Sequence, residues 1–141
     1  VKDILRLSII RRFATQKNFI KGNSMVPTFI EGEVVFLRKV LFRFSPKRFD
    51  IVKFNFNDIN YVKRVIGLPN ETIALKKTNI SINSQVISET FVRLDFLFSD
   101  LFCKLDDDEI FVLGDNRSNS ADSRTLGPIM LSQVTGFIRH V

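Results

Sequence analysis

The sequence predicts a mainly β fold, either an antiparallel β-barrel or a β-sandwich. Short runs of β-branched and aromatic residues recur along the chain, and turn residues separate them. Helical periodicity is weak, and neither a repeat of fixed period nor a low-complexity linker is present. The length of 141 residues is enough for one domain with a proper core and a small second lobe.

The strand signal occurs in several segments of the chain, namely 31–42, 48–56, 61–68, 71–87, 109–114 and 133–141. The segment "NDIN" (57–60) predicts a turn between the second and third of these segments, so residues 53–64 predict a β-hairpin. Asn79 interrupts the 71–87 segment, which therefore predicts two short strands.

The remaining apolar segments are less regular. Residues 3–13 have the spacing of a short helix, whereas residues 91–103 have mixed spacing that leaves a helix and a loop both open. No run of 18 apolar residues exists, so no segment of this chain is expected to span a bilayer. The chain begins without Met, and we expect it to lack an N-terminal segment of the native protein.

Composition narrows the classes of partner and cofactor. The net charge is +6, but the basic residues form neither a stripe interleaved with aromatics nor Cys/His finger spacing. Nucleic acid is therefore not an expected partner, whereas an anionic membrane surface is compatible with the charge. Cys103 is the only Cys and His140 the only His, so we predict no internal disulfide, no His-based metal site and no cofactor.

The inventory of reactive side chains favours one kind of nucleophile. Cys103 is flanked by apolar residues, which is typical of core packing. A Ser-His-Asp triad would depend on His140 at the extreme C-terminus, where chains fray. Ser paired with a neutral Lys is the remaining system, and that Lys must lie in apolar surroundings, since burial lowers its pKa from about 10.4.

Ser24 and Lys63 are the candidates for this pair. Ser24 lies in "GNSMVPTF" (22–29), although Gly, Asn, Ser and Pro are also ordinary turn residues. Lys63 interrupts the apolar strand "YVKRVIGL", where alternation places Tyr61 and Val65 on its face and lets them desolvate its amine. The pattern alone favours an edge strand with a solvated Lys63, because lysines in strands are mostly exposed.

A third candidate feature is the segment "GDNRSNSADSRTLG" (114–127). Its Asp, Asn and Ser residues are compatible with a plain polar loop built from Asx and Ser turns. They are equally compatible with an ordered loop that braces a site, in which Asp122 and Arg124 pair and a Ser hydroxyl orients a neutral amine. Composition alone leaves both interpretations open.

Taken together, these segments resemble the type I signal peptidases. "GNSMVPTF" resembles the Ser-Met-x-Pro-Thr motif of that family, "RFDIVKF" its Arg-Gly-Asp-Ile-Val-Val-Phe motif and "YVKRVIGLPNE" its Lys-Arg-x-x-Gly-Leu-Pro-Gly-Asp motif. "GDNRSNSADSRTLG" matches Gly-Asp-Asn-Arg-x-x-Ser-x-Asp-Ser-Arg-x-x-Gly throughout. The motifs occur in the family's order and span most of residues 20–138. The chain departs from them at Phe49, which stands for a Gly, at Lys53, which stands for a Val, and at Asn70, which stands for a Gly but tolerates positive φ.

The resemblance implies a fold and a division of the chain. The fold is a signal-peptidase-like antiparallel β-barrel or β-sandwich core with a small second lobe. Residues 20–77 and 108–141 would form the catalytic core, 78–107 an inserted lobe, and 1–19 a juxtamembrane segment.

The resemblance also implies roles for individual residues. Ser24 would be the nucleophile and Lys63 the general base, with the backbone N–H of Ser24 stabilising the oxyanion. Gly22 stands where some relatives carry a Ser hydroxyl, so that side-chain donor would be missing. The resemblance also implies supporting residues: Ser120 would hydrogen-bond to the Lys63 amine, and Asp122 would pair with Arg124. The implied lining of the substrate pockets consists of Ile20, Met25, Phe29 and Val62.

The implied activity is removal of signal peptides from preproteins after small residues at positions −1 and −3, on the outer side of a bacterial cytoplasmic membrane. The implied partners are preprotein signal peptides and the lipid surface. One alternative is a signal-peptidase-like accessory or chaperone protein of Gram-positive pili, which would bind pilins or pilus-assembly proteins. Another is the peptidase domain of a self-cleaving SOS repressor, which the absence of a visible DNA-binding helix pair and cleavage loop disfavours.

Overall fold

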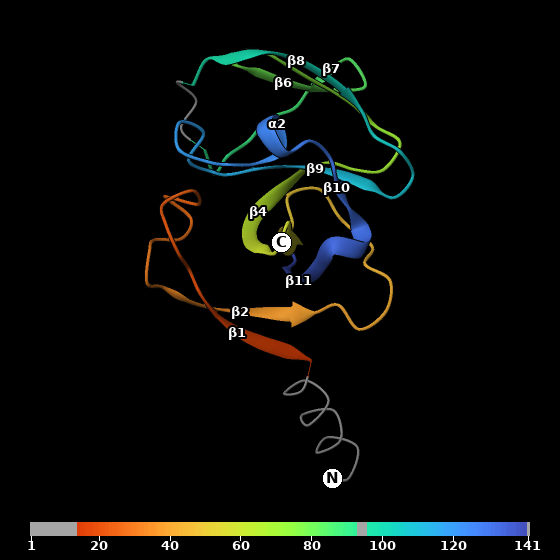
Figure 1. Cartoon of the computed structure of the whole chain (residues 1–141). Coiled ribbons are helices and arrows are strands. Elements are labelled where there is room, and N and C mark those ends of the chain that lie inside the picture. The colour runs from red at the N-terminus through yellow and green to blue at the C-terminus, as the bar shows by residue number, and fades with distance from the viewer. Residues whose placement is uncertain (1–13, 93–95, 141) are drawn as a thin grey trace.

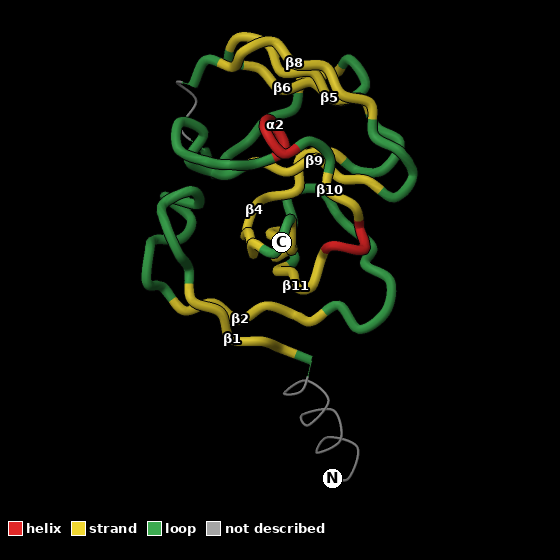
Figure 2. Tube along the Cα trace, viewed as in Figure 1, coloured by secondary structure: helices red, strands yellow, loops and turns green. Residues whose placement is uncertain are grey.

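The protein is built from two antiparallel β-sheets with very little helix, as the computed structural model shows for residues 14–92 and 96–140 (Figures 1 and 2). The larger sheet has seven strands in the order β1-β2-β11-β3-β4-β9-β10. Their bounds are β1 Thr15–Phe19, β2 Val34–Lys39, β3 Ile51–Phe56, β4 Ile59–Gly67, β9 Glu109–Leu113, β10 Ile129–Met130 and β11 Val134–Ile138. Its two edge strands, β1 and β10, do not pair with each other in the described residues, so the mainly β fold is confirmed without a closed barrel.

The β-hairpin predicted for residues 53–64 is confirmed as β3 and β4. Asn57 and Asp58 both have positive φ, of 49° and 62°, which is the geometry of a tight two-residue hairpin turn. The register places Lys53 opposite Val62 and Val52 opposite Lys63. Each opposed pair shares one face of the sheet, so the hairpin presents Lys53 and Val62 together.

The smaller sheet has four strands in the order β7-β6-β5-β8 and covers the end of the molecule away from β1 and β2 (Figure 1). Its strands are β5 Thr72–Lys77, β6 Asn79–Ile82, β7 Gln85–Val86 and β8 Phe98–Lys104. The 71–87 segment thus contains three strands instead of the two expected. The extra turn lies at Asn83 and Ser84, both with positive φ.

Residues 98–104 correct the expectation of a helix or loop for 91–103, because they form the edge strand β8. Leu101 and Cys103 lean toward the core while Phe102, between them, is exposed. Apolar side chains on both faces hide the alternation by which a strand is recognised. Residues 93–95 of this segment lie outside the described residues, as does the possible helix at 3–13.

Strand β1 was not expected from the sequence. Its residues, "TQKNF", carry few of the β-branched and aromatic side chains that mark strands, yet all five pair with β2. The pairing runs from Thr15 opposite Arg38 to Phe19 opposite Val34. Backbone hydrogen bonding therefore continues up to the turn that contains Ser24.

Strands β4 and β9 lie between two hydrophobic cores. In β9, Ile110 and Val112 belong to one core cluster, while Phe111 belongs to the other, and in β4 the neighbours Val65 and Ile66 divide in the same way. Burial on both faces explains why the sequences of these strands are nearly continuous apolar runs. Close packing on both faces also holds these strands in place, so a side chain on them can be positioned accurately.

Two residues that depart from the signal peptidase motifs have a left-handed backbone conformation. Asn70 has φ 67°, which agrees with the expectation that Asn preserves this turn in place of Gly. Phe49 has φ 69°, a conformation that costs a residue with a Cβ roughly 1–2 kcal/mol.

In the part of the chain that the structure describes, no helix has the length and apolar character needed to cross a bilayer.

Candidate active site

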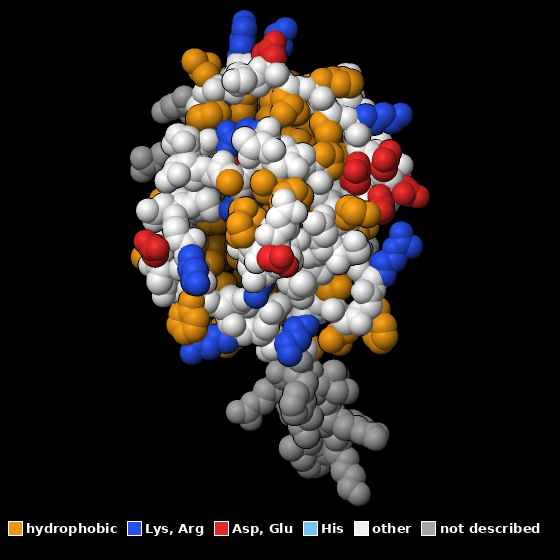
Figure 3. Space-filling model, viewed as in Figure 1, with side chains coloured by type: hydrophobic (Ala, Val, Ile, Leu, Met, Phe, Trp, Pro, Cys, Tyr) orange, Lys and Arg blue, Asp and Glu red, His pale blue; other side chains and the backbone are white. Residues whose placement is uncertain are grey.

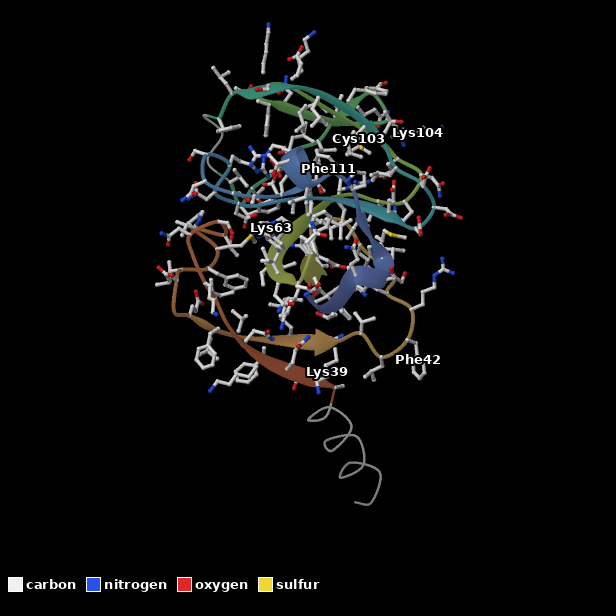
Figure 4. The ribbon with its side chains drawn as sticks, in the orientation of Figure 1. Lys39, Phe42, Lys63, Cys103, Lys104 and Phe111 are labelled. Carbon is white, nitrogen blue, oxygen red and sulfur yellow. The ribbon has the colours of Figure 1, made fainter. Side chains whose placement is uncertain are left out.

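A cleft of about 770 Å³ lies between the β3–β4 hairpin, the turn after β1 and the loop before α2 (Ser123–Leu126). Residues 18–25, 58–63 and 119–121 and Lys53 line it. Lys63, labelled in Figure 4, extends from β4 toward the turn after β1. Of the expected pocket residues, Ile20, Met25 and Val62 line the cleft, and so does Gly22.

Ser24 and Lys63 meet in this cleft. Lys63 Nζ lies 2.7 Å from Ser24 Oγ and donates a second hydrogen bond to the carbonyl of Val62 at 3.0 Å. The turn that presents Ser24 is held from both sides: Phe29 N donates to the carbonyl of Met25, and Asn116 N donates to the carbonyl of Ser24, both at 2.9 Å. The two residues are therefore within direct proton-transfer distance.

The environment of Lys63 favours the neutral amine. Its side chain is buried, with the residue only 4% exposed, and the Tyr61 ring centroid lies 5.6 Å from Nζ. Burial lowers the pKa of Lys63 from 10.5 to about 8, while the negative charges of Asp122 and Asp115 oppose the shift. The solvated edge-strand lysine that the pattern alone favoured is thus wrong, because the turn and loop cover this strand.

Ser120 also lines the cleft, but the hydrogen bond expected between it and Lys63 is not formed. Ser120 Oγ is buried and is the one buried side-chain oxygen or nitrogen of the described residues without a hydrogen bond of ordinary geometry. It lies close enough to Asp122 to help lower the pKa of that carboxyl. The hydroxyl therefore stands beside the site with its hydrogen-bonding capacity largely unused.

Gly114 makes room for Ser24 and Ser120 to approach one another. A Cβ at this position would lie 2.1 Å from Ser120 Oγ and 2.6 Å from the backbone oxygen of Ser24. Such distances are well inside van der Waals contact, so no other residue fits here without displacing one of the two serines. The Gly at the end of β9 is thus explained by close packing in the site.

The expected pair of Asp122 and Arg124 is present and orders the loop. Arg124 Nε and one Nη each donate to a carboxylate oxygen of Asp122 at 2.9 Å, and Gly114 N donates to the same carboxylate at 2.9 Å. Although burial alone would raise it, these hydrogen bonds and the Arg124 charge lower the pKa of Asp122 below its usual value. Asp122 also caps α2, accepting from Arg124 N.

A second buried network, missed by the sequence analysis, joins the motifs on the opposite face of β4. Arg64 donates from Nε and one Nη to Asp115 at 2.9 Å and 2.7 Å, and both side chains are almost fully buried. Thr28, from the Ser24 turn, also donates to Asp115. All three residues lie inside the motifs quoted above. Their membership in those motifs was the only sequence signal that could have pointed to this network.

Three expected or possible site residues lie elsewhere. Phe29 does not line the cleft and instead packs against the core cluster of Ile20, Val35 and Leu37. His140 lines a separate cavity of about 270 Å³ beside Phe49. Cys103 is half-buried in the smaller lobe, where burial, aided by Glu109, raises the pKa of its thiol.

The backbone N–H of Ser24 is available as a donor. No hydrogen bond among the described residues uses the N–H of Ser24, whereas Gly22 N donates to Glu31 Oε1 at 3.1 Å. Gly22 has φ 73°, and a Cβ there would meet no atom within 4 Å. The space for a side-chain donor at Gly22 is therefore empty, and the N–H of Ser24 faces no competing acceptor.

Comparison with known proteins identifies the family. The model of the family "Signal peptidase, peptidase S26" matches residues 3–141. The chain belongs to this signal peptidase family. It is 35% identical to "Signal peptidase I" of Bacillus amyloliquefaciens, over 94% of this chain and 78% of the relative. It is 36% identical to "Signal peptidase I S" of Bacillus subtilis, over 94% and 79% respectively.

A solved structure of a signal peptidase I from Enterococcus faecalis is also similar, with a TM-score of 0.61 and 30% identity over 69% of this chain and 99% of that one. The resemblance predicted from the four motifs is thereby confirmed, and with it the signal-peptidase-like fold. Membership in this family of serine peptidases supports a role in signal peptide removal.

Proposed function

We propose that this signal peptidase family member is a serine endopeptidase that cleaves preproteins with Ser24 as nucleophile and Lys63 as general base. The observation that carries the proposal is the 2.7 Å separation of Lys63 Nζ and Ser24 Oγ in a cleft of about 770 Å³. A Lys with a pKa of about 8 is partly neutral near physiological pH, so it can accept the Ser24 proton.

The reaction divides into two transfers. Neutral Lys63 takes the proton of Ser24 Oγ, which attacks the scissile carbonyl, and the resulting ammonium protonates the leaving amine as the C–N bond breaks. The products of this half are the mature protein and an ester between Ser24 and the signal peptide. Lys63 then deprotonates a water molecule that attacks the ester, and the proton returns to Ser24 as the peptide leaves with a new carboxylate.

The groups around the pair supply positioning and charge stabilisation. The free N–H of Ser24 would donate to the oxyanion of each tetrahedral intermediate, an interaction worth about 2.7–4 kcal/mol in a comparable protease. Gly22 adds no side-chain donor. Ser120 Oγ, which has no ordinary hydrogen bond at rest, would accept one from Lys63 once the amine is protonated. Asp122 and Arg124 would hold the loop that carries Ser120.

The cleft suits an extended substrate with small side chains. Such a peptide can lie alongside residues 59–63 of β4, which pair with β3 but not with β9, because peptides commonly add to free strand edges. The buried side chains of Ile20 and Met25, together with Val62, would form the apolar walls of shallow pockets for small residues at −1 and −3. Preproteins with an Ala-x-Ala site are therefore the proposed substrate class.

The outer face of β1 and β2 is suited to a lipid surface. Phe19 and Phe36 are 62% and 64% exposed, and Val34, opposite Phe19, is also exposed. Lys17 lies over the Phe19 ring at 5.2 Å and opposite Phe36 in the register. Hydrophobic and basic side chains adjoin at the lower edge of Figure 3, where β1 and β2 lie in Figure 1. Exposed aromatics beside lysines favour an anionic membrane interface, so we place the domain at the outer surface of a bacterial cytoplasmic membrane.

The decisive experiment is cleavage of a preprotein with an Ala-x-Ala site, in detergent or lipid, by the wild type and by Ser24→Ala and Lys63→Met. Each substitution should lower kcat by about 10³-fold or more. Ser99→Ala and Lys76→Met, at exposed positions of the smaller sheet, are matched controls that should retain full activity. Cleavage that persists in Ser24→Ala and Lys63→Met would refute the proposed pair. No cleavage by the wild type, with tight binding to pilus-assembly proteins, would indicate an accessory role.

A further inference from the structure

The cleft contains a second lysine that the proposed reaction does not use. Lys53, on β3, lines the cleft, and its ammonium donates to Asn18 Oδ1 of β1 at 2.6 Å. None of the ion pairs formed among the described residues involves Lys53. A lysine ammonium has three N–H donors, so donors remain for a ligand after the bond to Asn18.

The register fixes where this ammonium lies relative to the catalytic pair. Lys53 is directly opposite Val62 in the β3–β4 hairpin, so the two side chains share a face, and Val62 precedes Lys63. Asn18 lies in β1, upstream of the turn that presents Ser24. The contact between Lys53 and Asn18 therefore joins β3 to β1 within the cleft lining, at a residue of β1 that precedes both Ile20 and Ser24 in the chain.

An extended substrate would bring one particular side chain to this contact. Alternate residues of a strand point the same way and lie roughly 7 Å apart. If the −1 residue occupies the pocket beside Ser24 and Met25, the −3 residue reaches the next position along the cleft, toward Asn18 and Val62. Ile20 and Val62 line the cleft, and so does Lys53, whose side chain lies on the same face of the sheet as that of Val62.

We propose that Lys53, held by Asn18, makes the −3 subsite of this enzyme polar and cationic, so that it selects a small residue with a carboxylate or other acceptor over a branched aliphatic one. The inference rests on the proposed peptidase function. A carboxylate at −3 would gain a charge-assisted hydrogen bond, whereas Val would bury its methyl groups against a solvated cation. Lys53 is thus a specificity-determining residue and takes no part in the chemistry.

The test uses four versions of one preprotein that keep Ala at −1 and carry Ala, Val, Asn or Asp at −3. For the wild type, kcat/KM should be about tenfold higher with Asp than with Val, the size of one charge-assisted hydrogen bond. In Lys53→Val this order should reverse, because the substitution removes the cation and supplies an apolar wall. Lys76→Val, at an exposed position of β5 in the smaller sheet, removes the same charge and should leave the order unchanged.

A second measurement needs only the wild type. The ratio of kcat/KM for Asp over its isosteric neighbour Asn at −3 should fall toward one as salt is raised, because added ions screen a partly exposed charge pair. A ratio that is independent of salt, or a −3 order that is identical in the wild type and Lys53→Val, overturns the inference. If Lys53→Val does not fold, the salt dependence alone decides.

The outcomes separate this inference from the function on which it rests. Cleavage of the Ala substrate that depends on Ser24, combined with a −3 order insensitive to Lys53, refutes the cationic subsite and leaves the peptidase intact. Absence of cleavage of all four substrates refutes both. Reversal of the −3 order by Lys53→Val supports both.

Discussion

The two faces of β4 bury neighbouring cations in opposite ways. On the cleft face, Lys63 has no carboxylate within ion-pair distance among the described residues, and burial lowers its pKa to about 8. On the other face, Arg64 makes two hydrogen bonds to the buried carboxylate of Asp115. The comparison shows how one strand provides both a base that can lose its proton and an anchor that cannot, since guanidinium stays charged.

The two cations differ in the charge of the groups that accept their hydrogen bonds. Lys63 faces a hydroxyl and a carbonyl, which are neutral acceptors, so its charged form is poorly compensated. Arg64 faces a full negative charge at bonding distance, which compensates its desolvation. Asp115 is bound as well by Thr28, so the anchor fastens the Ser24 turn to the strand that carries Lys63.

The largest expected effect comes from breaking the anchor. Asp115→Ala leaves the Arg64 charge buried without its partner and should lower the free energy of unfolding by about 3–5 kcal/mol. Lys63→Met, by contrast, removes a poorly compensated charge and should leave the free energy of unfolding unchanged or higher, although it is expected to abolish the proposed activity. Urea denaturation of both variants measures the contrast, and equal destabilisation by the two would contradict it.

The next effect concerns the protonation of the base. Because burial lowers the pKa of Lys63 and only the neutral amine accepts a proton, kcat/KM should rise with pH and level off above about 8. Below that pKa the neutral fraction falls tenfold per pH unit, so activity at pH 6 should be about 100-fold below the plateau. A pH profile on an Ala-x-Ala substrate measures this. A plateau reached already at pH 6 would mean that Lys63 is not the titrating base.

The smallest effect tests the packing that connects the two faces. Gly114 precedes Asp115 and touches both Ser24 and Ser120, so Gly114→Ala should push the serines apart and lower kcat by about tenfold or more. The apparent pKa of the pH profile should stay near 8 if Lys63 remains buried. Retention of wild-type kcat would show that the site tolerates displacement of these residues.

Local sequence patterns were informative where one interaction dominates. The β3–β4 hairpin followed from the turn at Asn57 and Asp58, whose positive φ values match the residue types. Strand β8 could not be recognised, because Phe102 is apolar yet exposed and so conceals the alternation. Strand β1 was missed for the opposite reason, since its polar residues owe their conformation to pairing with β2 and not to their own propensity.

By itself, the sequence determined the mainly β fold and the family, because short-range periodicity and motif order survive without coordinates. It also singled out Ser24 and Lys63 through their motifs. Only the tertiary structure decided that Lys63 is buried with a lowered pKa, that Arg64 is neutralised by Asp115, and that Lys53 meets Asn18 in the cleft. The physical reason is that desolvation and charge pairing depend on groups that lie far apart in the chain and become neighbours only when the sheet curls around the cleft.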